Sequence, residues 1–299
     1  MRWLRSVKDK TARYFMMGIA IFAILLLLVI GLSLFFKAFP IMREKNLWVL
    51  LTSANWKPFK GNFGFLPFIL STLYVSLIAI IIALPFSILT SIYLNTYASR
   101  SVRRFFEPVV DLLSGIPPVI YGVWGTLTIV PLIADKIAPG FVEFSTGYTV
   151  LAGGVVLAVM IIPLLISIMV EVFRTIPREM TDASLAMGAT KWQTVKKVIL
   201  RKSFPGIIAA TVLALSRAFG ETMAVLMVCG NITQIPHSIF DACYPLPALI
   251  ANNYGEMLSM PSYESALMLS AFILFIIVVF FNGLSRFTLN QIEKRYQFS

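Results

Sequence analysis

The chain has 299 residues, of which 58% are hydrophobic and only 13% are charged, and its mean hydropathy is +0.85. A soluble domain is typically about half apolar and about a quarter charged. The composition therefore excludes a water-solvated globule, a disordered chain and a disulfide-stapled module, and it indicates that lipid is the main solvent. The net charge of +11 would indicate nucleic-acid binding in a soluble protein, so the positions of the basic residues decide its meaning.

Six stretches are long and apolar enough to cross a membrane, since a helix needs about 20 mainly apolar residues to span the hydrocarbon core. In chain order they are residues 15–36, 65–93, 109–133, 149–170, 204–228 and 265–284. The first stretch follows five basic residues, as a secretory signal does, but it is too long and lacks an A-x-A-like cleavage site, which indicates a retained anchor helix. We expect an all-α, polytopic membrane protein with six transmembrane helices.

The basic residues between these stretches predict the orientation of the chain. If both termini are cytoplasmic, 18 of the 25 Lys and Arg residues lie in cytoplasmic segments and 6 lie in external ones. Cytoplasmic loops of membrane proteins carry such an excess of Lys and Arg. We therefore expect a multi-pass protein of the cytoplasmic membrane with both termini inside, and no nucleic-acid partner.

Several kinds of catalytic motif are missing from the sequence. It contains no G-x-x-x-x-G-K-[ST] phosphate loop, no G-x-S-x-G elbow and no H-E-x-x-H helix, so no catalytic residue and no metal site are expected. The single histidine, His237, falls in an external loop, where a solvated side chain is the simplest interpretation. Cys229 and Cys243 lie near the outer end of the fifth stretch and in the loop after it. An external disulfide and two separate small apolar side chains are both open interpretations.

The fifth stretch carries two charged residues where an apolar helix is expected. Arg217 lies near its middle, and Glu221 follows four positions later. In a continuous helix, side chains at i and i+4 share one face and can pair. A charge near the bilayer centre costs roughly 2.5–3.5 kcal/mol on insertion scales, and such residues mark transport paths. We predict that Arg217 meets an oxyanionic substrate and that Glu221 holds its guanidinium or competes for it. A purely structural ion pair within the helix is the alternative.

The third stretch contains residues that a straight helix avoids, among them Pro117, Pro118 and several glycines. Proline removes a backbone donor and disfavours helix at the residue before it. A broken helix is tolerated at membrane depth only inside protein or beside water. We therefore predict that Pro117 and Pro118 belong to a broken helix that lines a cavity or acts as a hinge. A kinked packing helix is the alternative.

The longest cytoplasmic segment, residues 171–203, is also the most basic, with seven Lys and Arg residues. Thr175 and Pro177 are typical of a helix start and Gly188 of a helix end, and apolar residues recur at helical spacing beyond the glycine. Two short helices around a glycine are predicted. An interfacial helix attracted to anionic lipid is one interpretation of the basic residues.

The same segment resembles the E-A-A-x-x-x-G coupling loop of ABC importer permeases, with Asp182, Ala183, Ser184 and Gly188 at the positions of the motif. Asp182 replaces the usual Glu, Ser184 replaces the second Ala, and Arg201 stands where the family has a final Pro. Three further blocks resemble the permeases of the high-affinity phosphate importer. The block at residues 112–125 favours the PstC type over the PstA type. The three blocks are SRAFGETMAV at 216–225, NWKPFKGNFGFLPFI at 55–69 and LLSGIPPVIYGVWG at 112–125.

The resemblance implies the type I ABC importer permease fold and a transport subunit for inorganic phosphate that is not itself an enzyme. It implies a second permease of the PstA type, two ATP-binding subunits of the PstB type and an external phosphate-binding protein of the PstS type. ATP and Mg²⁺ would be bound by the partner ATPase subunits, with no cofactor in this chain. The four motif residues of the loop would contact the ATPase, and Arg217 and Glu221 match the charged pair of the family on the phosphate path.

The predicted organisation has four parts. Residues 1–36 form a cytoplasmic N-terminus and the first helix, 37–64 an external segment, 65–284 the permease core with the coupling loop at 175–203, and 285–299 a cytoplasmic tail. Two other functions are open. One is the same machine carrying another oxyanion, such as molybdate or sulfate. The other is an ion-coupled secondary transporter, which would be expected to show paired broken helices in repeated halves, whereas one broken stretch and no clear repeat are visible.

Overall fold

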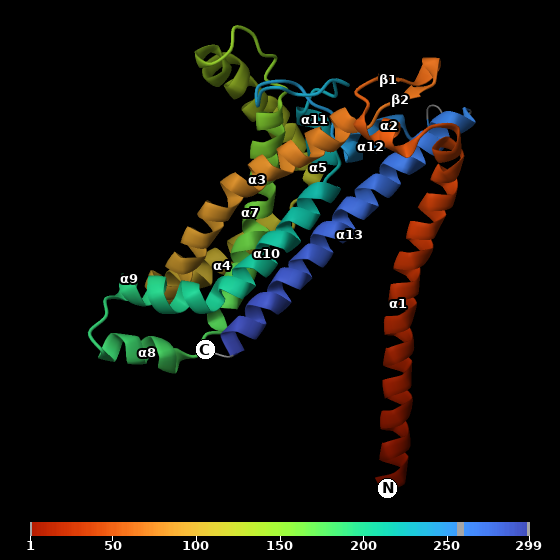
Figure 1. The fold of residues 1–299 in the computed structure, drawn as a ribbon. Helices are drawn as coiled ribbons and strands as arrows, with labels where there is room; N and C mark the ends of the chain where they lie inside the picture. The colour runs from red at the N-terminus through yellow and green to blue at the C-terminus, as the bar shows by residue number, and fades with distance from the viewer. Residues whose placement is uncertain (1, 256–259, 298–299) are drawn as a thin grey trace.

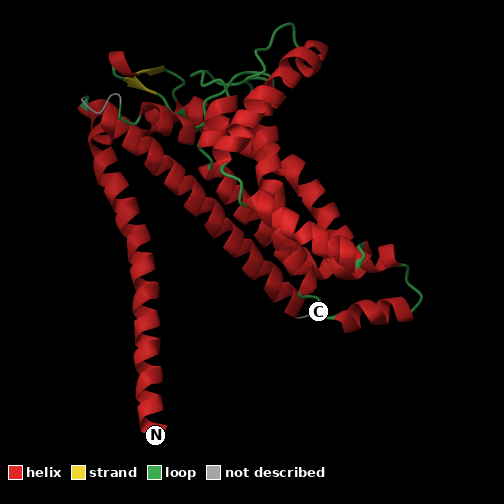
Figure 2. Cartoon of the chain, turned by 180° about the vertical axis from the view of Figure 1, so that it is seen from behind, coloured by secondary structure: helices red, strands yellow, loops and turns green. Residues whose placement is uncertain are grey.

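The computed structural model describes residues 2–255 and 260–297, and the chain is helical almost throughout (Figures 1 and 2). The prediction of an all-α protein with six membrane spans is confirmed. Within the described residues, the helices long and apolar enough to span a membrane are Thr11–Glu44, Leu66–Tyr97, Pro118–Gly140, Val150–Arg174, Lys191–Gly220 and Pro261–Leu284. The described strands, β1 (Trp56–Lys57) and β2 (Asn62–Phe63), form one short antiparallel hairpin.

The spans are assembled from the helices labelled in Figure 1. In chain order these are α1 (Arg2–Glu44), α2 (Leu47–Thr52), α3 (Leu66–Ile92), α4 (Arg100–Ser114), α5 (Pro118–Trp124), α6 (Val130–Leu132), α7 (Val150–Arg174), α8 (Arg178–Ala186), α9 (Lys191–Thr194), α10 (Leu200–Gly220), α11 (Met223–Val228), α12 (Leu246–Asn253) and α13 (Pro261–Gln297). π-Helical turns extend several of them without interruption, namely η2 (Tyr93–Tyr97), η3 (Gly125–Ile129), η4 (Ile133–Ile137) and η6 (Val195–Ile199). The 3₁₀ turns are η1 (Pro58–Lys60) and η5 (Ala138–Gly140).

The centre of the bundle is the pair α3 and α7, which lie side by side. A Cβ atom added to Gly154 of α7 would lie 2.4 Å from Cγ2 of Ile78 on α3, so only glycine allows this approach. Further along α7, a Cβ at Gly206 of α10 would lie 2.3 Å from Cγ1 of Val172. Small residues bring membrane helices together in this way, because close backbone contact replaces the hydrophobic effect that lipid does not supply.

The first helix, α1, touches the bundle over only part of its length. Gly31 of α1 faces the ring of Phe275, and the rings of Phe35 and Phe272 are 5.7 Å apart, which joins α1 to α13. Towards its N-terminus α1 diverges from α13 (Figure 1), and its apolar side chains between residues 11 and 30 are exposed almost throughout. An exposed apolar surface of this length suits a helix surrounded by lipid.

The two ends of the molecule are built from different elements. At one end lie the hairpin of β1 and β2 with α2 and α12, and we call it the hairpin end (Figure 1). At the opposite end lie α8, the start of α1 and the last turns of α13, and we call it the α8 end. Both chain termini therefore emerge on the same side as α8.

The predicted bounds of the third span, 109–133, are wrong. The residues before the double proline form α4, a separate and strongly amphipathic helix, and the span itself runs from Pro118 to Gly140. Pro117 has extended backbone (φ −59°, ψ 138°) and Pro118 occupies the first helical position of α5. Proline is tolerated there because the first turn of a helix needs no N–H donor. The break thus lies at the start of the span.

The predicted bounds of the fifth span, 204–228, are also wrong at both ends. The helix begins at Lys191 and runs through α9, η6 and α10 to Gly220, so the predicted second short helix of the loop is the start of a membrane span. Thr190 and Gln193 form a capping box that fixes this start. At the other end the helix stops at Gly220, and a separate short helix, α11, follows.

Candidate substrate path and coupling surface

The break after Gly220 separates the two charged residues that the sequence places on one helix. Arg217 is half-buried in the last turn of α10, whereas Glu221 lies beyond the helix with extended backbone (φ −72°, ψ 120°) and is only 9% exposed. Within the described part of the chain, no ion pair joins them. The expected pairing at i+4 is therefore wrong. The Glu221 carboxylate instead accepts a hydrogen bond from the Ala224 N–H of α11 at 3.3 Å.

The break depends on how α11 packs. A Cβ at Gly122 of α5 would lie 2.7 Å from Sδ of Met227 and 3.2 Å from Cα of Ala224, so α5 and α11 are in backbone contact. The Thr126 hydroxyl lies 3.1 Å from the Met227 carbonyl oxygen, within hydrogen-bonding distance. Glycine has low helix propensity, so the helix is easily interrupted at Gly220. The contact with α5 then decides the direction that the chain takes after it.

Tyr121 links the third span to α4. It is a buried residue of α5, and its hydroxyl donates a hydrogen bond of 2.8 Å to the Leu113 carbonyl oxygen of α4. Beside Arg217, the buried Ser216 hydroxyl has no hydrogen-bond partner among the described residues. Sequence reasoning did not name Tyr121 or Ser216, although both lie within the blocks that carry the family resemblance.

The prolines predicted to line a cavity lie at the junction of α4 and α5. Pro117 is exposed and Pro118 is half-buried. The chain turns here, because α4 ends at Ser114 and α5 begins at Pro118. Their role in a cavity or hinge stays a prediction.

The predicted coupling residues Asp182, Ala183 and Ser184 lie on α8, and Gly188 lies in the turn after it. Gly188 has φ +84°, in the left-handed region where a side chain is strained, and this ends the helix. The predicted helix followed by a glycine turn is thus confirmed. None of the nine residues of α8, all described, is buried. Asp182 and Ala183 are exposed, so this surface is free to dock.

A cavity of about 590 Å³ lies between α8 and the ends of the membrane helices. Its walls include Thr181, Asp182 and Leu185 of α8 together with Thr96 and Phe173 of the bundle. A polar contact across this region is the 2.9 Å hydrogen bond between the hydroxyls of Ser184 and Thr194. Few contacts therefore hold α8 against the bundle.

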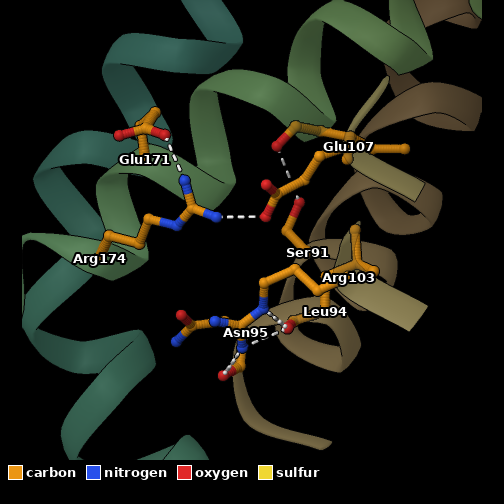
Figure 3. A network of polar contacts seen from close by, with 8 residues as sticks. Ser91, Leu94, Asn95, Arg103, Glu107, Glu171 and Arg174 are labelled. Atoms are coloured by element: carbon orange, nitrogen blue, oxygen red, sulfur yellow. Dashed lines mark hydrogen bonds and ion pairs between the residues drawn. The ribbon is translucent and has the colours of Figure 1, made fainter. Parts of the chain in front are cut away.

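Arginines tie α4 to the ends of its neighbours at this same end of the molecule (Figure 3). Arg103 donates to the carbonyl oxygen of Leu94 from Nε at 3.0 Å and from Nη2 at 2.7 Å. It thereby caps the helix formed by α3 and η2, whose last carbonyl groups have no partner within the helix. Arg174, in the last turn of α7, pairs with Glu171 at 2.8 Å and also with Glu107 of α4. Arg174 precedes α8 by four residues, so this network fixes the end of α7 from which the chain continues into α8.

The six apolar helices of the described chain define an integral membrane protein. Residues 83–296 match the family model described as the binding-protein-dependent transport system inner membrane component, and the chain belongs to this family.

Its relatives are permease subunits. The phosphate transport system permease protein PstC of Mesorhizobium japonicum is 34% identical, over 98% of this chain and 96% of that protein. The probable phosphate transport system permease protein PstC of Methanocaldococcus jannaschii is 33% identical, over 86% of each chain. The probable ABC transporter permease protein YqgH of Bacillus subtilis is 39% identical over 69% of this chain and 66% of that protein.

Solved structures show the same fold. A chain of the bacterial alginate ABC transporter, crystallised with a periplasmic protein bound to alginate pentasaccharide, superposes with a TM-score of 0.63 at 16% identity, over 94% of this chain and 97% of that chain. A chain of the MetNI methionine ABC transporter in an inward-facing conformation gives a TM-score of 0.54 at 21% identity, over 74% and 91%. The permease fold of type I ABC importers is thereby confirmed.

Proposed function

We propose that this chain is a permease subunit that moves inorganic phosphate across the cytoplasmic membrane, driven by ATP hydrolysis on partner subunits. The observation that carries the proposal is the half-buried Arg217 in the last turn of α10, next to the break after which α11 packs against α5 of the third span. An arginine presents a permanent charge and a planar fork of donors that suit a phosphate oxygen. The PstC relatives, which align over nearly the whole chain, support phosphate as the ion.

The geometry gives each path residue a separate role. Arg217 and the unpaired Ser216 hydroxyl supply donors for an anion. Glu221 is held by the Ala224 N–H and does not neutralise Arg217, so the guanidinium stays available. A transport site must bind weakly enough to release its ion, and one arginine with a nearby carboxylate meets that condition.

The exposed face of α8 is the proposed docking site for the ATPase. Asp182, Ala183, Ser184 and Gly188 would contact a PstB-type subunit, of which the complex holds two, and those subunits would bind ATP and Mg²⁺. A PstA-type permease would complete the pathway, and a PstS-type protein would deliver phosphate at the hairpin end. The α8 end, with both termini, would face the cytoplasm, as the distribution of basic residues favours.

Replacing Arg217 tests the path. Arg217→Ala should insert and assemble normally, whereas phosphate uptake should fall about 10- to 100-fold, since hydrogen bonds to charged groups contribute roughly 1.5–3 kcal/mol. Arg104→Ala, which removes an exposed arginine of α4, is the matched control. Uptake of labelled phosphate by cells is measured with sulfate and molybdate as competitors. Normal uptake by Arg217→Ala would remove this residue from the mechanism, and equal inhibition by sulfate would contradict phosphate as the ion.

Replacing Asp182 tests the docking site. Asp182→Lys should lower the amount of ATPase subunit that is recovered with the permease in detergent. Glu143→Lys, in the loop before α7, makes the same charge change away from α8 and should leave recovery unchanged. Equal recovery with both variants would contradict the coupling role of α8.

A further inference from the structure

The only two cysteines of the sequence meet at the hairpin end. Cys229 follows the last residue of α11, and Cys243 lies three residues before α12. The Cys243 N–H donates to the Cys229 carbonyl oxygen at 2.8 Å, and the Asn231 N–H donates to the Cys243 carbonyl oxygen at 3.1 Å. Gly230 and Cys243 form an isolated β-bridge. The loop of residues 230–242 thus returns to its own starting point and places the two cysteines side by side.

Both thiols are shielded from solvent. Both cysteines are 0% exposed, and the backbone hydrogen bond between them places their thiols in the same buried site. A Cβ at Gly153 of α7 would lie 2.5 Å from Sγ of Cys229, so α7 closes the site on that side. A chain with two cysteines 14 positions apart has no general reason to bring them together. The structure holds both as free thiols, and the backbone hydrogen bond between the two residues gives the close approach that a disulfide needs.

We propose that Cys229 and Cys243 are joined by a disulfide bond in the mature protein. The proposal rests on the orientation given above, in which the hairpin end faces the external compartment, where disulfides form and persist. The two thiols lose two protons and two electrons as the S–S bond forms. A disulfide of an extracytoplasmic thiol–disulfide oxidoreductase accepts the electrons through a mixed disulfide and becomes a dithiol. Because both sulfurs are buried in the finished fold, this exchange takes place before the loop closes.

The bond would hold the loop over the start of α7. The Val150 N–H donates to the Asp241 carbonyl oxygen at 2.9 Å, and the Leu151 N–H donates to the Ile239 carbonyl oxygen at 2.9 Å. These are N–H groups of the first turn of α7, which have no partner within the helix. The loop therefore caps a central helix of the bundle. Closing it covalently at Cys229 also anchors the end of α11, the segment that carries the chain on from Glu221.

Mass spectrometry tests the bond directly. The complex is purified without reductant, its free thiols are alkylated with N-ethylmaleimide in denaturant, and the chain is digested with chymotrypsin. Trypsin is unsuitable because no Lys or Arg lies between residues 218 and 285, so both cysteines would stay on one peptide. We expect two peptides joined until a reductant is added. Two separately alkylated peptides would overturn the proposal.

Two controls test the disulfide independently of the membrane orientation and of the transport function. Cys243→Ser should give an alkylated Cys229 peptide and no linked pair, and amide exchange in residues 231–242 should become several-fold faster than in the oxidised wild type. In a variant with both cysteines replaced by serine, Phe59→Cys offers a thiol at a 79% exposed position in η1 of the hairpin end. A membrane-impermeant maleimide should label it in intact cells. If the Phe59→Cys thiol is labelled and the wild-type cysteines are nevertheless alkylated, the orientation holds and the disulfide alone is overturned. If the wild type takes up no phosphate, only the proposed function is contradicted.

Discussion

The hairpin end and the α8 end of this protein are held together by different means. At the hairpin end, the ring of Trp56 lies 5.6, 5.4 and 5.0 Å from the rings of Phe63, Phe65 and Phe68, and the last three side chains are buried. At the α8 end, none of the described residues of α8 is buried, and a cavity of about 590 Å³ lies beneath it.

The difference shows which end is free to move. Local unfolding and displacement require least energy where few apolar contacts are buried. The hairpin end is therefore expected to behave as a fixed body. In contrast, α8 can shift against the bundle, because Arg174 holds only the end of α7 before it and the contact between Ser184 and Thr194 is its polar link to the bundle. A rigid hairpin end and a movable α8 suit the proposed function, in which substrate arrives at the hairpin end and the ATPase acts on α8.

The largest expected effect comes from the aromatic cluster. Phe68→Ala should destabilise the protein by about 3–5 kcal/mol, because it removes a fully buried ring and leaves a cavity. Phe59→Ala, at a 79% exposed position of the same end, should change stability by less than about 0.5 kcal/mol. Thermal unfolding of both variants in detergent measures the difference. Equal midpoints would show that the hairpin end is not held by its aromatic core.

A buried hydroxyl at the same end should have the next largest effect. Thr72 accepts a hydrogen bond from the Leu246 N–H at 2.9 Å and thereby ties α12 to α3. Thr72→Val leaves that buried N–H without a partner, which should cost about 1–3 kcal/mol. Thr52→Val, at an exposed position where the hydroxyl donates only to the Trp48 carbonyl oxygen, is the control. The same thermal assay is used, and a loss no greater than that of the control would contradict the role of this contact.

A substitution in the turn after α8 should change the stability of α8 alone. Gly188→Ala places a side chain at φ +84°, which costs about 1–2 kcal/mol for an L-residue, although nothing lies within 4 Å of the added Cβ. Because α8 is not buried, we expect amide exchange in α8 to accelerate roughly tenfold with little change in the global unfolding midpoint. Gly140→Ala adds a Cβ to equally open space without positive φ and should leave exchange unchanged. A shift of the global midpoint instead would show that α8 is part of the cooperative core.

The smallest effect on stability is expected at Arg174. Arg174→Gln removes two partly exposed ion pairs, and exposed pairs contribute at most about 1 kcal/mol each. The expected consequence is mechanical: phosphate moved per ATP hydrolysed by the reconstituted complex should fall. Exchanging the charges in Arg174→Glu with Glu107→Arg should restore part of the ratio. If Arg174→Gln lowers the thermal midpoint strongly and leaves the ratio unchanged, the network is only a structural support.

Some features followed from the sequence because they depend on local properties of the chain. Hydropathy adds up residue by residue, so all six membrane spans were predicted. Gly188 was predicted to end a helix because its left-handed backbone requires no knowledge of the rest of the fold. The docking role of Asp182 rests on the family resemblance. The substrate role of Arg217 rests on its charge in the middle of an apolar stretch as well as on that resemblance, and both roles stay predictions.

Other features were decided by the tertiary structure. The pattern of residues 204–228 is that of a continuous apolar helix, and only the contact of α11 with Gly122 shows where it breaks and why Glu221 leaves the face of Arg217. Likewise, Thr126 reaches the Met227 carbonyl oxygen through packing between segments that lie far apart in the sequence. Cys229 lies beside Cys243 because the loop between them returns on itself. Membrane insertion depends on the composition of each segment, whereas helix breaks and side-chain partners depend on which other segment fills the space beside them.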